Sequence, residues 1–149
     1  MTIVIEYASP MNLFDSEAIE FLQGSWLMRL ATMSSDGYPH VTPVWYVYED
    51  ERIFTSTEKD RVKFRNVARD NRVGASIDWE PRPYRGLSLK GIAHVHENNI
   101  RERVRQISAR YVPADEVDAM VDWLFKGPRV VLEIEPVSVV KVGAGWRTH

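Results

Sequence analysis

Short runs of apolar residues dominate the chain, and in most of them apolar and polar positions alternate as they do in β-strands. These runs predict strands over residues 26–33, 39–48, 53–57, 72–79, 87–96 and 129–142, the last as one long strand or as two strands bent at Pro136. The run 39–48 is apolar on both faces, which indicates a strand buried on both sides, as in a closed barrel. Pro43 lies within it and cannot donate a ladder hydrogen bond, so it marks an edge or a bulge.

Helical periodicity separates some of these strands. One helix is expected to open at residues 14–16 and to end at Gly24, and others are expected over 61–70, 99–111 and 115–125. The Asp36-Gly37 step predicts a tight hairpin turn. Because hairpin connections dominate, the sequence predicts one mainly β domain, 1–149, in which six antiparallel strands close into a barrel with flanking helices.

Composition narrows the function classes. Of 149 residues, 44% are hydrophobic and 27% are charged, which is typical of a soluble globular protein. The net charge of -2 provides no overall attraction to nucleic acid or to an anionic membrane. There is no cysteine, which excludes disulfides and thiolate chemistry. We see no signal peptide and no apolar run of about 20 residues, so we expect a cytoplasmic protein without a membrane partner.

The richest candidate chemistry lies between residues 55 and 66. Three hydroxyl residues close a strand there, and cations follow at every second position as a helix starts: Thr55, Ser56, Thr57, Lys59, Arg61 and Lys63. Hydroxyls, positive charge and free N–H groups at a helix N-terminus are what a phosphate group requires. The same pattern also fits a solvated basic helix that leaves a strand. Lys63 lies beside the apolar face of this helix, where a lysine is less expected without a partner.

The histidines provide a weaker pattern. His94 and His96 share one strand face, a spacing that can ligate a metal, but no third ligand is evident. We therefore interpret them as surface histidines and expect no metal site.

Several of these segments together resemble the pyridoxamine 5'-phosphate oxidase-like FMN-binding split-barrel family. The resemblance covers about half the chain, from residue 26 to residue 95. Its motifs are Leu30-Ala31-Thr32-Met33, Asp36-Gly37-Tyr38-Pro39, Thr42-Pro43-Val44-Trp45, Phe54-Thr55-Ser56-Thr57, Arg61-x-Lys63-x-x-Asn66 and Asp70-x-Arg72-Val73.

This resemblance implies a homodimer that holds two flavin-type cofactors in clefts between its subunits. Arg61 and Lys63 would pair with the cofactor phosphate, and the backbone at 43–45 would lie against the ring. The remaining residues that it implies for cofactor binding are the hydroxyls and nearby polar residues Thr55, Ser56, Thr57, Lys59 and Asn66, and, as candidates from the second subunit, Trp79, Lys90 and Trp146. The ring-contacting positions are Pro43, Val44 and Trp45.

The function implied is an FMN-dependent oxidoreductase that transfers hydride or electrons to a small substrate. The cofactor carries the redox chemistry, so no side-chain nucleophile is required. The Arg- and His-containing C-terminal motif of true vitamin B6 oxidases is not apparent in 137–149, so we do not expect that activity. The Arg-x-Lys spacing resembles the branch that uses the deazaflavin coenzyme F-420, which is the first alternative.

Two further alternatives belong to other classes of protein. One is a non-catalytic flavin- or haem-binding module. The other is a nucleic-acid-binding domain, which the sequence disfavours because the positive charge is local and no basic platform with interleaved aromatic residues is visible.

Overall fold

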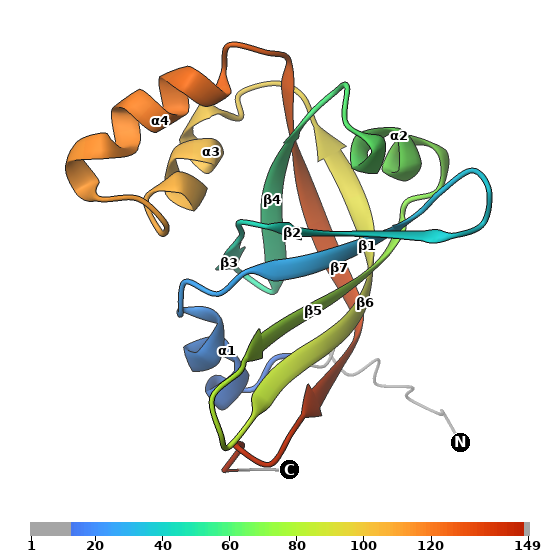
Figure 1. The fold of residues 1–149 in the computed structure, drawn as a ribbon, viewed down its shortest axis with the longest axis vertical. Helices are drawn as coiled ribbons and strands as arrows, with labels where there is room; N and C mark the ends of the chain where they lie inside the picture. Colours follow the sequence, from blue (N-terminus) through green and yellow to red (C-terminus); the bar gives the residue numbers. More distant parts are fainter. Residues whose placement is uncertain (1–12, 148–149) are drawn as a thin grey trace, which may run out of the picture.

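A single curled sheet organises the protein. The computed structural model describes residues 13–147, and within that range seven antiparallel strands follow the order β2-β1-β5-β6-β7-β4-β3 (Figure 1). The strands are β1 (Met28–Met33), β2 (Pro39–Val44), β3 (Val47–Glu49), β4 (Arg52–Glu58), β5 (Arg72–Trp79), β6 (Arg85–His96) and β7 (Arg129–Val142). The predicted antiparallel split barrel is thereby confirmed.

The strand count differs from the prediction because 39–48 is two strands rather than one. The break falls at Trp45 and Tyr46, where side chains replace ladder partners. The Thr55 hydroxyl donates to the Trp45 carbonyl at 2.7 Å, and the Tyr46 N–H donates to the Tyr111 hydroxyl at 3.1 Å. Since β2 and β3 form the two edges of the sheet, these two residues carry the chain from one edge to the other.

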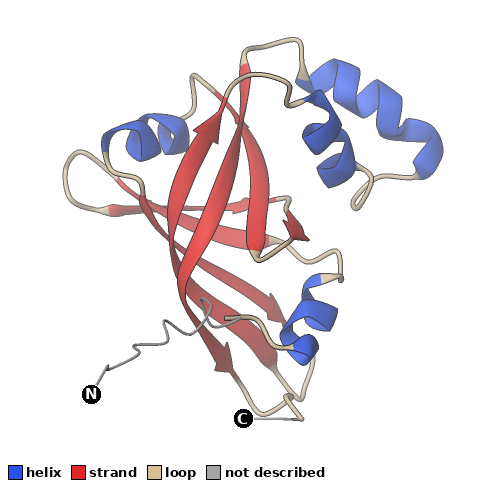
Figure 2. Ribbon diagram, turned by 180° about the vertical axis from the view of Figure 1, so that it is seen from behind, coloured by secondary structure: helices blue, strands red, loops and turns tan. Residues whose placement is uncertain are grey.

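Helices cover the ends of the curled sheet (Figure 2). They are α1 (Ser16–Leu22), α2 (Val62–Arg69), α3 (Arg101–Ser108), the 3-10 turn η1 (Ala114–Glu116) and α4 (Val117–Leu124). The pair α3–α4 lies between β6 and β7 in the sequence and stands at one end of the barrel, whereas α1 lies at the other (Figure 1). No helix in the described part of the chain is both long and apolar enough to cross a membrane.

Two apolar clusters meet back to back on β4 and β7. The larger one fills the barrel, and its fully buried members include Met28, Ile53 and Leu132. The smaller one lies under α3 and includes the neighbours Phe54 and Val131. Because successive side chains of a strand point to opposite faces, both strands are buried on both sides at this end, and α3 is fixed to the barrel.

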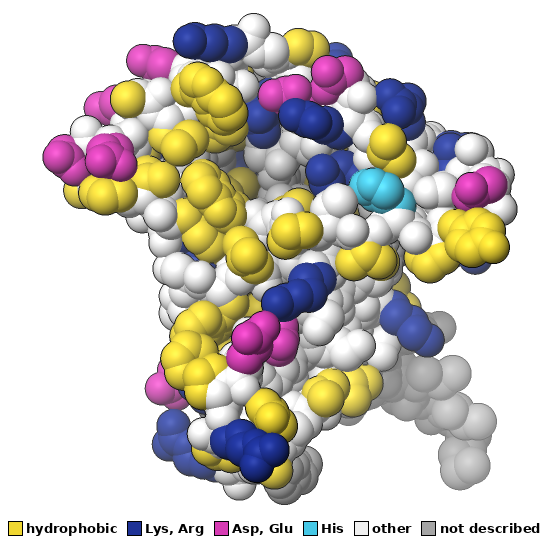
Figure 3. Space-filling model, in the orientation of Figure 1, with side chains coloured by type: hydrophobic (Ala, Val, Ile, Leu, Met, Phe, Trp, Pro, Cys, Tyr) yellow, Lys and Arg dark blue, Asp and Glu magenta, His cyan; other side chains and the backbone are white. Residues whose placement is uncertain are grey.

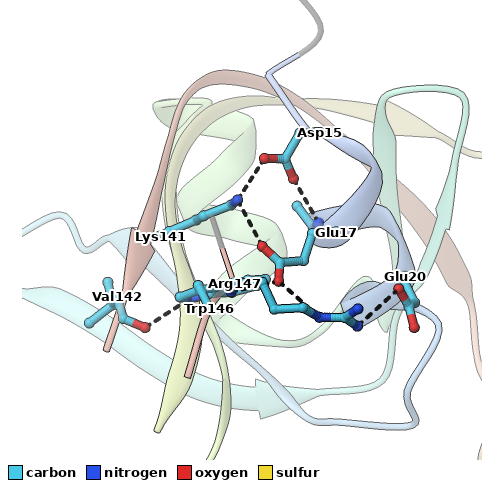
Figure 4. A network of polar contacts seen from close by, with 8 residues as sticks. Asp15, Glu17, Glu20, Lys141, Val142, Trp146 and Arg147 are labelled. Atoms are coloured by element: carbon cyan, nitrogen blue, oxygen red, sulfur yellow. Dashed lines mark hydrogen bonds and ion pairs between the residues drawn. The ribbon is translucent and has the colours of Figure 1, made fainter. Parts of the chain in front are cut away.

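Ion pairs close the end of the barrel beneath α1 (Figure 4). The Lys141 ammonium lies 2.6 Å from Asp15 and 3.3 Å from Glu17. The Arg147 backbone N–H also donates to Glu17, at 2.8 Å, and the Trp146 indole N–H donates to the Val142 carbonyl at 3.0 Å. These contacts attach the last residues of the described chain to the first helix.

Candidate functional site

A pocket of about 660 Å³ opens at the end of the barrel that carries α3 and α4. Its size is within the usual range for small-molecule sites. Figure 3 shows a hollow below these helices with Lys and Arg side chains around it. The lining comes from the β2–β3 break, from β4 with the start of α2, and from the helix pair: Leu27, Pro43, Val44, Trp45, Ser56, Thr57, Glu58, Arg61, Lys63, Val104, Ile107, Ser108, Met120, Trp123, Leu124 and Arg129.

One side of this pocket is cationic. Arg61 and Lys63 enter from the start of α2, and Arg129 enters from the first position of β7. The register of β4 with β7 pairs Glu58 with Arg129, which brings the two segments together. We call Arg61, Lys63 and Arg129 the cation cluster.

Arg129 is the most tightly held member of the cation cluster. Its side chain is only 8% exposed. Its guanidinium donates to the Ser56 hydroxyl at 2.9 Å and to the Leu124 carbonyl at 3.0 Å, and it lies 3.6 Å from the Glu58 carboxylate. The same guanidinium therefore contacts β4 and the last residue of α4.

The cation cluster has more positive charge than its carboxylate partner can balance. Of the lining residues, only Glu58 is acidic; it lies 3.7 Å from Arg61 and 3.6 Å from Arg129. Burial, followed by the positive charges of Arg61 and Arg129, lowers the pKa of the Lys63 ammonium. Burial likewise lowers the pKa of Arg129. A bound anion would offset both effects, so this donor set fits a phosphate group.

Backbone donors lie next to the same cations. Helix α2 begins after Arg61, whose backbone is extended, and no side chain caps its first turn. The first N–H groups of a helix have no partner within it and can donate to an anion. The hydroxyls of Ser56 and Thr57 add two further possible donors.

The structure brings together seven of the thirteen predicted cofactor-binding residues. All seven line the pocket: Pro43, Val44, Trp45, Ser56, Thr57, Arg61 and Lys63. Thr55 does not line it. Thr55 is fully buried, and its hydroxyl holds the Trp45 carbonyl, so it supports the break between β2 and β3 from behind.

Two further predicted residues on the same stretch lie outside the pocket lining. Lys59 forms an ion pair with Glu97 at 3.0 Å. Asn66 is buried and donates to the Thr32 hydroxyl at 3.0 Å, which connects α2 to β1. The sequence pattern alone does not show that Lys59 and Asn66 have partners within the protein.

The three residues predicted to reach the cofactor from a second subunit are also outside the pocket of their own subunit. Trp79 packs against Trp26 with ring centroids 4.7 Å apart. Trp146 is 4% exposed and belongs to the barrel core. Lys90 is exposed on β6. The buried position of Trp146 gives that residue a structural role in its own subunit.

Sequence reasoning missed Arg129, Glu58 and the wall formed by α3 and α4. Arg129 follows Gly127-Pro128 directly and opens a strand that is otherwise apolar for several residues, which was the available signal. Its position opposite Glu58 depends on strand register, and no local pattern gives that register.

The paired histidines have acidic neighbours on β7. His94 Nε2 lies 2.8 Å from Glu135 and His96 Nε2 lies 3.1 Å from Glu133. Within residues 13–147, no group of three or more His, Cys, Asp or Glu side chains is placed to hold a metal ion. Both histidines thus have local partners on the surface of the sheet.

Comparison with known proteins identifies relatives over nearly the whole chain. The family model for pyridoxamine 5'-phosphate oxidase matches residues 14–143. A 5a,11a-dehydrotetracycline/5a,11a-dehydrooxytetracycline reductase of Streptomyces rimosus is 33% identical over 98 residues, which covers 60% of this chain and 69% of that protein.

Solved structures show the same fold. A conserved hypothetical protein of Mycobacterium tuberculosis is 27% identical, with a TM-score of 0.71 over 91% of this chain and 94% of that one. A protein described as an F420 reductase is 23% identical, with a TM-score of 0.66 over 81% of this chain and 94% of that one. At 23% identity the second likeness concerns the fold alone.

Proposed function

Because this chain belongs to the pyridoxamine 5'-phosphate oxidase family, we propose that it is an oxidoreductase that binds a flavin-type cofactor, FMN, in the pocket under α3 and α4. The observation that carries the proposal is the cation cluster. Three positive side chains face one carboxylate beside two hydroxyls and an uncapped helix start. That arrangement fits a dianionic phosphate.

The cofactor phosphate would be held by Arg61, Lys63 and Arg129 together with Ser56 and Thr57. The ring would lie along the backbone of residues 43–45, at the end of β2, where Pro43 has no N–H for a ladder bond. When bound, the cofactor would supply hydride or electron transfer to a small substrate. The side chains of the protein would bind the cofactor, orient it and exclude water.

The deazaflavin coenzyme F-420 is the second candidate. Like FMN, it carries a phosphate on its ribityl chain, and the cation cluster is suited to either. The similarity to a tetracycline-type reductase supports reductase chemistry, and the spacing of Arg61 and Lys63 supports the deazaflavin alternative. The substrate and the cytoplasmic location stay predictions.

We also propose a homodimer formed through the outer face of the sheet. Val41 on β2 and Val140 on β7 are 58% and 55% exposed on this face. From Val41 the strand register passes through the small residues Ala31 and Gly74 to Lys90 and then to Ser138, two residues before Val140 on β7. A face with small residues at its centre and exposed valines on either side suits a second copy, and Lys90 would then lie at the contact between subunits.

The dimer is tested by light scattering of the double variant Val41→Glu with Val140→Glu. Buried like charges should separate the subunits, so we expect the mass of one chain instead of two. Tyr84→Glu is the matched control because Tyr84 is 52% exposed in the β5–β6 loop. A double variant that keeps the mass of two chains would place the contact elsewhere.

The cofactor is tested by the absorbance spectrum of the freshly purified protein and by mass spectrometry of what it releases on denaturation. The mass of FMN with an oxidised-flavin spectrum supports the proposal, whereas a deazaflavin mass supports the alternative and a Soret band indicates haem. Reoxidation of the reduced cofactor by a specific acceptor distinguishes an enzyme from a non-catalytic module. A protein that releases nothing and binds neither added FMN nor deazaflavin would overturn the proposed function.

A further inference from the structure

We propose that the substrate reduced or oxidised in this pocket is an uncharged, ring-bearing apolar molecule, and that α3 and α4 hold it with Trp123 as the principal contact. This inference rests on the proposed function, because it assigns the part of the pocket that the cofactor phosphate does not need. We call Val104, Ile107, Met120, Trp123 and Leu124 the helix wall.

The pocket lining is divided by charge. All four of its charged residues, the cation cluster and Glu58, come from β4, α2 and the start of β7. The lining residues from α3 and α4 and from the β2–β3 break have no charge. Ser108, the polar residue on the helix side, donates its hydroxyl to the Val104 carbonyl at 2.9 Å within α3. The helix side of the pocket therefore offers a ligand apolar contacts only.

The helix wall has a fixed base and an adaptable rim. Val104 and Ile107 are 1% and 3% exposed and belong to the cluster that includes Phe54, so they are held by the barrel. Met120 is only partly buried, and methionine adapts its shape readily to an apolar partner. A rigid base beside a flexible side chain suits a set of molecules that each contain an apolar ring but differ in shape.

Trp123 is the residue of the helix wall whose side chain most lacks packing contacts. Its side chain is 61% exposed at the pocket, although tryptophan is highly buried on average. Trp26, Trp45, Trp79 and Trp146 each pack against another aromatic ring in the described chain, but Trp123 has no such neighbour there. A flat apolar molecule over the indole would provide the missing contact.

The charged residues of the pocket disfavour ionised substrates. An anion would compete with the cofactor for the cation cluster. A cation would find only Glu58, which already lies within 3.7 Å of Arg61 and Arg129. Transfer of either ion onto the helix wall would remove it from water without a partner, which is strongly unfavourable. A neutral molecule meets neither obstacle.

The test compares two small aromatic probes of nearly the same shape: the neutral naphthoquinone menadione and the anionic 1,4-naphthoquinone-2-sulfonate. Each is titrated into the cofactor-loaded protein, labelled with 13C in the methionine methyl groups. The Met120 methyl signal, assigned with Met120→Leu, reports occupancy of the helix wall independently of turnover. We expect menadione to shift it saturably and the sulfonate to bind about tenfold more weakly, which corresponds to about 1.4 kcal/mol.

Variants at Trp123 locate the contact. Trp123→Ala should weaken menadione binding by about tenfold, and Trp123→Phe should restore most of it, while cofactor affinity stays unchanged in both. Tyr84→Ala is the control because Tyr84 is also an exposed aromatic residue but does not line the pocket. Cofactor affinity is measured first, so loss of the cofactor is distinguishable from loss of the probe.

Three results would overturn the inference and leave the proposed cofactor binding in place. Equal or tighter binding of the sulfonate would assign the pocket to charged substrates. Unchanged menadione affinity in Trp123→Ala would remove Trp123 as the contact. If Trp123→Ala instead lowers the mass in solution to a single chain, a second copy covers the helix wall. Failure to bind either cofactor would remove the proposed function and this inference with it.

Discussion

The two ends of the barrel each contain a lysine close to a glutamate, and the pKa values of the two ammonium groups are shifted in opposite directions. At the α1 end, hydrogen bonding to Asp15 raises the pKa of Lys141. At the pocket end, burial and the positive charges of Arg61 and Arg129 lower the pKa of Lys63. Carboxylates of the fold balance the charge of Lys141, whereas too little negative charge lies near Lys63 to balance the cation cluster.

The opposite pKa shifts distinguish a lysine with a structural role from a cluster of cations suited to a ligand. Lys141 has Asp15 and Glu17 as direct partners and connects β7 to the first helix (Figure 4). The cation cluster holds three positive groups for the one carboxylate of Glu58 and opens into a pocket. A cluster of like charges is costly in an empty protein, so its presence indicates a ligand that supplies the opposite charge.

The largest effect should come from removing two members of the cation cluster together. Arg61→Ala with Lys63→Ala should weaken binding of the phosphate-bearing cofactor by about 3–6 kcal/mol, roughly 10²- to 10⁴-fold, because each charged hydrogen bond contributes about 1.5–3 kcal/mol. Fluorescence or calorimetric titration with the cofactor measures this.

The matched control removes two cations that do not line the pocket, Arg65 on α2 and Arg72 at the start of β5. In Arg65→Ala with Arg72→Ala, cofactor affinity should stay within about threefold of the original protein, since distant surface charges are screened by salt. An equal loss in both double variants would mean that general positive charge, rather than the cation cluster, attracts the cofactor.

The next largest effect compares two arginines that donate to backbone carbonyls, Arg129 in the pocket lining and Arg110 outside it. Arg129→Met should weaken cofactor binding by about 1.5–3 kcal/mol, because it removes one charged partner of the phosphate. Arg110 follows α3 and does not line the pocket, and its guanidinium donates to the carbonyls of Gly24 and Tyr46, both at 2.8 Å. Arg110→Met should lower the free energy of unfolding by about 2 kcal/mol and leave cofactor affinity unchanged.

Urea unfolding and cofactor titration of both arginine variants provide the measurement. If Arg110→Met lost cofactor affinity to the same extent as Arg129→Met, membership of the pocket lining would not explain the role of Arg129.

A smaller effect should appear in the pH dependence of cofactor binding. Lys63 has a lowered pKa in the free protein, and a bound phosphate raises it, so affinity is full at neutral pH and falls as pH rises through that lowered value. Between pH 7.5 and 10.5 we expect a loss of about tenfold, or about 1.4 kcal/mol. Calorimetric titrations across this range measure it. Lys63→Arg should remove most of the pH dependence, since arginine stays charged throughout; an identical decline in that variant would assign it to another group.

The smallest effect should come from Lys141→Met at the balanced end. Hydrogen bonding to Lys141 lowers the pKa of Asp15, so this stabilisation is full above the unfolded-state value near 3.8 and is lost as pH falls through the lowered value. The variant should lower Tm slightly at pH 7 and converge with the original protein near pH 2. Thermal unfolding at both pH values measures this, and a change in cofactor affinity would contradict it.

The sequence predicted most of the fold because each strand repeats its pattern over many residues. The run 72–79 coincides with β5, and 129–142 coincides with β7 despite Pro136. The prediction for 39–48 was less accurate, since the Thr55 and Tyr111 side chains that interrupt it at Trp45 and Tyr46 are distant in sequence. Local patterns contain no information about such partners.

The candidate site divides in the same way. The pocket residues of the β4–α2 segment lie within eight positions of one another in the sequence and form a motif. Arg61 and Lys63 were predicted from that motif. Arg129 was missed because only strand register places it beside them, and the helix wall was missed because Val104 and Trp123 fit ordinary amphipathic helices. Whether Asn66 would contact a ligand or its neighbour Thr32 required the folded structure.

β6 and β7 are adjacent antiparallel strands, and residues 97–128, including α3 and α4, occupy the connection between them. The helix wall is thus an insertion in a hairpin, whereas the phosphate-binding residues other than Arg129 belong to β4 and α2. Long insertions at such connections cost little in chain entropy. Evolution or a protein engineer could therefore exchange this segment and alter which molecule is accepted, while the barrel keeps the same means of holding its cofactor.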